Sequence, residues 1–126
     1  MEQNTFFQAS DGWLFSTMLS FHRRKLSLSK LIMLGNLLNH CIFTLDQIND
    51  GLSRLESEGY ISFEDKRVFL TPKAKEFHTA NKKRFEPCIA QQVRYSEIFS
   101  KMKLEKEANQ KVFFTQEEYL LAIEKY

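Results

Sequence analysis

The segment from Thr44 to Gly59 constrains the fold of this chain more than any other segment. Residues 44–47, Thr-Leu-Asp-Gln, have the form of a capping box, in which Thr44 caps a helix and the side chain of Gln47 returns a hydrogen bond. Apolar side chains then recur at spacings of 3, 4 and 3 positions, at Leu45, Ile48, Leu52 and Leu55. This spacing defines one buried helix face, and Gly59 is a typical stop signal. The sequence therefore predicts a helix from about Leu45 to Glu58.

Cap residues and apolar spacings predict the other elements. In order, they are a helix from Asp11 to about residue 21, a helix entered at Ser27 or Ser29, a hairpin of residues 60–63 and 67–70, a helix from Thr71-Pro72, a helix from Pro87 to about Leu104, and a helix from Thr115. Only four Gly and two Pro occur in 126 residues, which disfavours a fold rich in tight turns. Residues 101–111 form the most polar stretch, and we expect them to be an exposed hinge.

Several function classes lack support in the sequence. Cys41 and Cys88 are too few and too far apart for a disulfide framework or a zinc site, and we expect Cys41 to be buried in a turn. No phosphate loop, paired-acid motif or nucleophile elbow is present, so we expect no enzyme activity, cofactor or metal. The longest apolar run, residues 119–123, is far shorter than the ~20 residues of a membrane span. We therefore expect a cytoplasmic protein with no membrane contact.

The order of the predicted elements is that of a winged helix-turn-helix domain. The residues that carry a family resemblance are Phe43-Thr44 through Leu52 and Leu55, Gly59-Tyr60-Ile61, and Phe69-Leu70-Thr71-Pro72. They resemble bacterial winged-helix regulators of the MarR and PadR kind over about residues 11–85. The resemblance implies that the third helix enters the DNA major groove and that the hairpin, or wing, lies against the backbone.

The fold that we expect is mainly α with a small β-hairpin. Residues 1–85 form the winged helix-turn-helix domain, and residues 86–126 form a helical extension. This extension either packs on the domain or serves for dimerisation, so a homodimer is one alternative.

Helix geometry selects candidate DNA contacts. If Ile48, Leu52 and Leu55 face inward, a step of about 100° per residue turns Asp46, Asp50, Ser53, Arg54 and Ser57 outward. The candidates are Ser53, Arg54 and Ser57 on the third helix, Lys66 and Arg67 at the wing tip, and Arg23, Arg24 and Lys25 after the first helix. The alternative interpretation of each group is structural: a solvated helix face, a charged turn, and a basic helix end favoured by the helix dipole.

Charge is segregated along the chain. Residues 45–65 carry one cation and six anions, whereas residues 22–44 carry four cations and no anion, and residues 66–84 carry seven cations and one anion. The leading hypothesis is a DNA-binding transcriptional regulator whose partner is double-stranded DNA. The alternative is a winged-helix protein–protein interaction module without DNA binding. In that module the acidic third helix would dock on a basic partner through Asp46 and Asp50.

Overall fold

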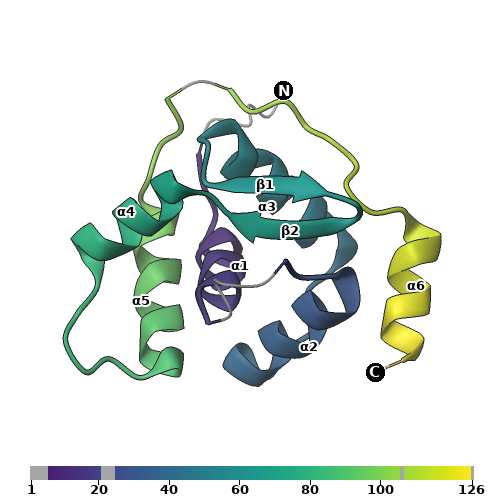
Figure 1. Ribbon diagram of the computed structural model, residues 1–126, viewed down its shortest axis with the longest axis horizontal. Coiled ribbons are helices and arrows are strands. Elements are labelled where there is room, and N and C mark those ends of the chain that lie inside the picture. The colour runs from purple at the N-terminus through teal and green to yellow at the C-terminus, as the bar shows by residue number, and fades with distance from the viewer. Residues whose placement is uncertain (1–5, 21–24, 106, 126) are drawn as a thin grey trace.

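A computed structural model describes residues 6–20, 25–105 and 107–125 of the chain. Within these ranges the chain forms six helices and one antiparallel hairpin (Figure 1). The elements are α1 (Ala9–Leu19), α2 (Leu28–Asn39), α3 (Leu45–Ser57), β1 (Ile61–Glu64), β2 (Arg67–Leu70), α4 (Pro72–Asn81), α5 (Cys88–Ser100) and α6 (Gln116–Glu124). The expected class, mainly α with a small β-hairpin, is confirmed.

The caps explain why the helices begin where the sequence predicts. Thr44 Oγ1 accepts a hydrogen bond from Gln47 N at 3.0 Å, and Gln47 Oε1 accepts one from Thr44 N at 2.9 Å. The same reciprocal pair forms between Thr115 and Glu118 at the start of α6. Each pair satisfies two backbone N–H groups that a helix start leaves without an internal partner.

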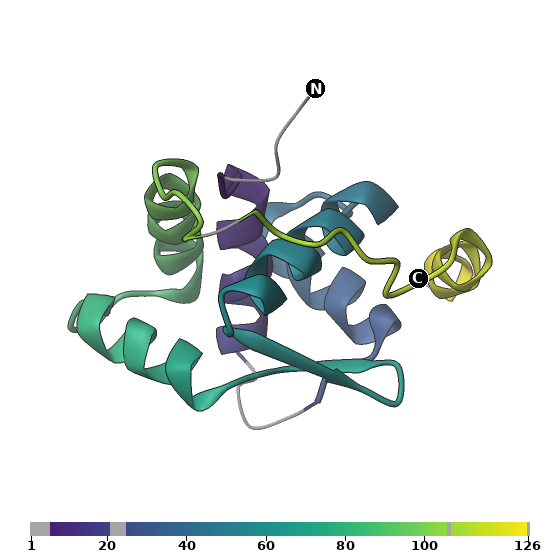
Figure 2. The same ribbon diagram turned by 90° about the horizontal axis from the view of Figure 1, so that it is seen from above.

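The central helix α1 is buried on all sides from Asp11 to Leu19. Figure 2 shows α1 between α5 and α3. Phe7 and Phe15 pack with Tyr95 and Phe99 of α5 in one aromatic cluster. The α5 part of the expected helical extension therefore packs on α1 within the same chain and shares its core.

The sequence prediction missed an isolated β-bridge to the hairpin. Leu26 forms an antiparallel bridge with Val68 of β2, with N–O distances of 2.8 and 2.9 Å in the two directions. The bridge holds Lys25 and Ser27, the neighbours of Leu26, beside β2.

Most of the described residues in 101–111 are exposed, as expected, but Leu104 and Ala108 are buried, so this stretch packs on the rest of the chain at two points. Another sequence expectation is wrong. Cys41 is exposed rather than buried, because it follows the left-handed cap residue His40 (φ 54°), where the chain leaves α2.

Candidate nucleic-acid interface

The outer face of α3 is not the exposed face that the leucine spacing predicted. Arg54 is only 8% exposed, and its guanidinium donates to both carboxylate oxygens of Asp11 in α1, at 2.7 and 3.0 Å. Gly51 leaves room for this contact, because a Cβ atom there would lie 2.8 Å from Asp11 Oδ1. The expectation that Arg54 points outward is therefore wrong, since this side chain ties α3 to α1.

Ser53 and Ser57 contact the C-terminal part of the chain. Ser53 is 1% exposed; its hydroxyl donates to Asn49 O and accepts from Lys111 N, both at 2.8 Å. Ser53 lies on the outer side of α3, but the segment around Lys111 covers it, so the exposure that we expected for it is wrong. Ser57 is half-buried and lines a small polar cavity of about 250 Å³ with Asn109 and Lys111.

Residues 107–115, which we call the strap, run along the outer side of α3 (Figure 2). The Asn49 carboxamide accepts from the backbone N–H groups of Phe113 and Phe114, both at 3.0 Å, and donates to Phe114 O at 2.9 Å. Two acidic residues of α3 are also engaged, since Asp50 accepts from Gln110 and Glu56 pairs with Lys111. The acidic face of α3 thus binds the chain's own strap.

The wing tip contacts the same C-terminal part. Lys66 Nζ donates to Phe113 O and to Glu118 Oε1, both at 3.1 Å. The pKa of Glu118 is lowered, first by its hydrogen bond from the Thr115 backbone and then by Lys66. Lys66 therefore already has a carboxylate partner, whereas Arg67 is exposed beside it.

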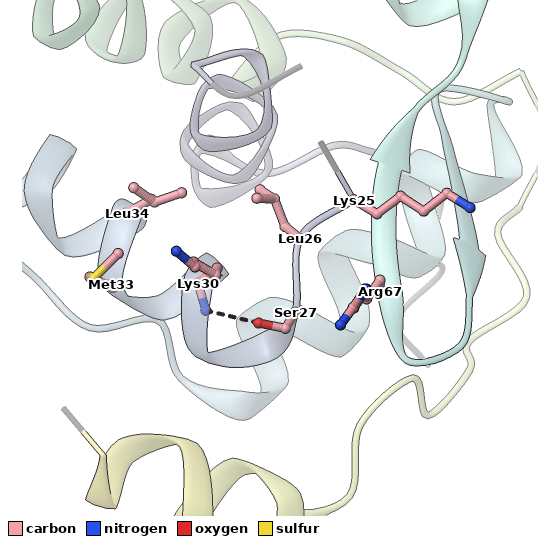
Figure 3. Close-up of a pocket in the computed structure, with 7 residues that line it drawn as sticks. All are labelled: Lys25, Leu26, Ser27, Lys30, Met33, Leu34 and Arg67. Atoms are coloured by element: carbon pink, nitrogen blue, oxygen red, sulfur yellow. Dashed lines mark hydrogen bonds between the residues drawn. The ribbon is translucent and has the colours of Figure 1, made fainter. Parts of the chain in front are cut away.

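Cations gather instead between α2 and β2. A cavity of about 330 Å³ is lined by residues that we call the basic groove: Lys25, Leu26, Ser27, Lys30, Met33, Leu34 and Arg67 (Figure 3). It includes two of the predicted DNA contacts, Lys25 and Arg67. Of the other predicted contacts, Arg23 and Arg24 lie outside the described residues.

The Leu26–Val68 bridge explains why these cations meet. In an antiparallel bridge the flanking residues oppose each other, so Ser27 faces Arg67 and Lys25 faces Phe69. The contacts agree with this register, because Lys25 Nζ lies 4.9 Å from the centre of the Phe69 ring. Ser27 also caps α2 by accepting from Lys30 N at 3.4 Å, and this brings the positive end of the helix dipole to the groove.

The three cations of the groove are not equally available. Lys25 pairs with Glu64, and this hydrogen bond lowers the pKa of that exposed carboxyl group. Within the described ranges, no carboxylate forms an ion pair with Lys30 or Arg67. A second cavity of about 330 Å³ shares Ser27, Lys30 and Met33 and adds Lys125 of α6. Neither cavity has an acidic lining residue among those described, so the groove suits an anion.

Comparisons with family models, with curated proteins and with solved structures find no match for this chain. None of the helices in the described ranges has the length and apolar composition needed to cross a bilayer. Across the same ranges, no group of three His, Cys, Asp or Glu side chains is placed to hold a metal ion.

Proposed function

We propose that this protein is a winged-helix DNA-binding regulator that contacts duplex phosphates through the basic groove. The observation that carries the proposal is the convergence of Lys25, Lys30 and Arg67 on one cavity at the start of α2. Arg67 supplies a planar fork suited to two phosphate oxygens, and Lys30 supplies a compact charge. With α3 covered, these contacts fix the position of the duplex without reading its bases.

The groove sets a modest salt dependence. Each phosphate that a cation neutralises changes the slope of log affinity against log salt by about −0.9, so three contacts give a slope of about −2.7. Raising the salt concentration from about 50 to about 200 mM should then weaken binding ~40-fold, well below the ~10³-fold or more expected for six to ten contacts.

The test is fluorescence anisotropy of a labelled ~30-bp duplex of mixed sequence at these two salt concentrations. The double variant Lys30→Glu with Arg67→Glu should bind more weakly to every sequence, and its salt slope should fall by about 2. Lys101→Glu is the matched control, because Lys101 follows α5, is 75% exposed and lines neither cavity. Equal losses in the control and the double variant would remove the groove as the binding surface.

The docked strap favours a second candidate, a winged-helix protein-interaction module. In this structure the outer face of α3 accepts an extended polypeptide through Asn49, Ser53 and Glu56. A module of this kind would show no duplex affinity even at about 50 mM salt, where phosphate contacts are strongest. The same titration therefore separates the two candidates.

A further inference from the structure

The C-terminal part of the chain occupies the side by which a winged helix approaches DNA. The strap lies on α3 and meets the wing tip at Lys66, and α6 lies beside α2 (Figure 1). Tyr119 of α6 also donates a hydrogen bond to Phe43 O, in the turn between α2 and α3. In helix-turn-helix proteins the second helix of the motif reads base edges while neighbouring elements contact the backbone. In this chain α3, the tip of the hairpin and the turn before α3 all contact the C-terminal part of the same chain.

The hydrogen bonds on α3 match those that a base edge would make. Asn49 uses both its acceptor and its donor, which are the groups an asparagine offers to the edge of adenine. Ser53 accepts from the strap backbone, and serine can bind either kind of base edge. The strap therefore satisfies the same side-chain groups that direct base reading would require.

The charges match as well. Glu118 holds the wing-tip Lys66 where a phosphate would otherwise bind it, and Glu117 adds a second carboxylate at the start of α6. Carboxylates and backbone carbonyls thus take the places of phosphates and base acceptors.

Two buried aromatic side chains hold the strap in its docked, closed position. Phe113 and Phe114 are 4% and 2% exposed, and both pack edge-on against Phe63 of the wing. Burying two phenylalanine side chains favours the closed strap by a factor of about 10²–10⁴. The apparent affinity of any ligand that needs the open face is lowered by the same factor.

From these contacts we propose that the strap and α6 are an intramolecular inhibitor of sequence-specific DNA binding, and that Asn49 and Ser53 contact bases once the strap is displaced. This inference rests on the proposed function. In the closed state the basic groove binds phosphates of any sequence. In the open state α3 adds base contacts, with Asn49 favouring adenine.

Two full-length variants test the inference. Phe113→Ala with Phe114→Ala removes the anchors and should open the strap by at least ~10²-fold. Lys111→Gln with Glu118→Gln cuts two exposed ion pairs, keeps the net charge and touches no buried side chain, so it guards against misfolding of the first variant. Val112→Ala is the matched control, because Val112 lies in the same strap and is 74% exposed. Hydrogen exchange at the amides of residues 111, 113 and 114 measures opening directly.

Duplex binding is then measured with a pool of ~30-bp duplexes of randomised sequence at about 200 mM salt. The opened variants should gain affinity in proportion to their opening and should select adenine-containing sites, and Asn49→Ala should abolish the selection. Opening without gain or selection overturns the inference. If an opened variant shows no gain or selection but still binds duplex through Arg67, the proposed function survives. If neither the opened variant nor the wild type binds duplex at about 50 mM salt, both proposals fail.

Discussion

Removing the Asp11 carboxylate should destabilise this protein far more than removing an exposed carboxylate. Asp11 is fully buried, Arg54 is nine-tenths buried, and two hydrogen bonds join them across α1 and α3. Asp11 also accepts from Gln8 N at 2.8 Å at the start of α1. Losing one partner of a buried ion pair costs about 3–5 kcal/mol, because the other charge stays out of water without it. We expect Asp11→Ala to lose this much free energy of unfolding.

Urea unfolding followed by circular dichroism measures the loss, and thermal unfolding should show a Tm lower by about 10–20 °C for a chain of this length. Glu97→Ala is the matched control. Glu97 forms an i,i+4 pair with Lys101, both side chains are over 70% exposed, and such a pair contributes about 0.5 kcal/mol or less.

A double variant separates the charge from the packing. Asp11→Leu with Arg54→Met replaces the pair by apolar side chains and should recover most of the stability, because no buried charge is left alone. The reasoning is refuted if Asp11→Ala lies within about 1 kcal/mol of the wild type. It is also refuted if the stability losses of Asp11→Leu and of Arg54→Met, each measured alone, simply add in the double variant, since contacting residues should show a coupling energy.

Three further predictions follow from individual contacts. Gly12→Ala should cost about 1–3 kcal/mol in urea unfolding, because its Cβ atom would lie 2.3 Å from Tyr95 O where α1 meets α5. The pKa of Glu86 is lowered, chiefly by hydrogen bonds from Arg94, so this pair stabilises the fold above the ordinary pKa of 4.5 and the contribution is lost as pH falls through the lower folded value. The free energy of unfolding should therefore fall less steeply with decreasing pH in Arg94→Gln than in the wild type. Cys41 is exposed, so a thiol reagent should modify it in the folded protein, and protection of this thiol would contradict the structure.

Local signals predicted the elements well because their causes are local. Thr44 and Gln47 lie within one helical turn, and the hydrogen bonds between them form as the capping box requires. The third helix ends at Ser57, within one residue of the predicted end. The wing strands likewise begin and end within one residue of their predicted positions.

The candidate site could not be predicted in the same way, because distant segments build it. The spacing of Ile48, Leu52 and Leu55 predicted a single inner face of α3. Asp11 of α1 makes a second buried face, because it pairs with Arg54 and draws that side chain inward. Nothing near Asn49 in the sequence marks it as the anchor of a strap more than 60 residues later. The Leu26–Val68 bridge that assembles the basic groove is equally remote in sequence.

The segregated charge along the chain acquires a physical reason in this arrangement. The acidic segment that suits DNA poorly is the segment that binds the C-terminal part of the chain. Asp50 and Glu56 bind the strap, and the Glu58 carboxylate accepts a hydrogen bond from Glu105 N. The two basic segments that flank the acidic segment are joined at the Leu26–Val68 bridge, where Lys30 and Arg67 line one groove. The acidic and basic segments thus have different partners. The acidic residues of α3 bind the chain's own strap, and the basic groove is left for the phosphates that we propose. A phosphate contact of this kind does not require the strap to move, whereas base reading does, and this difference makes the two proposals separable by experiment.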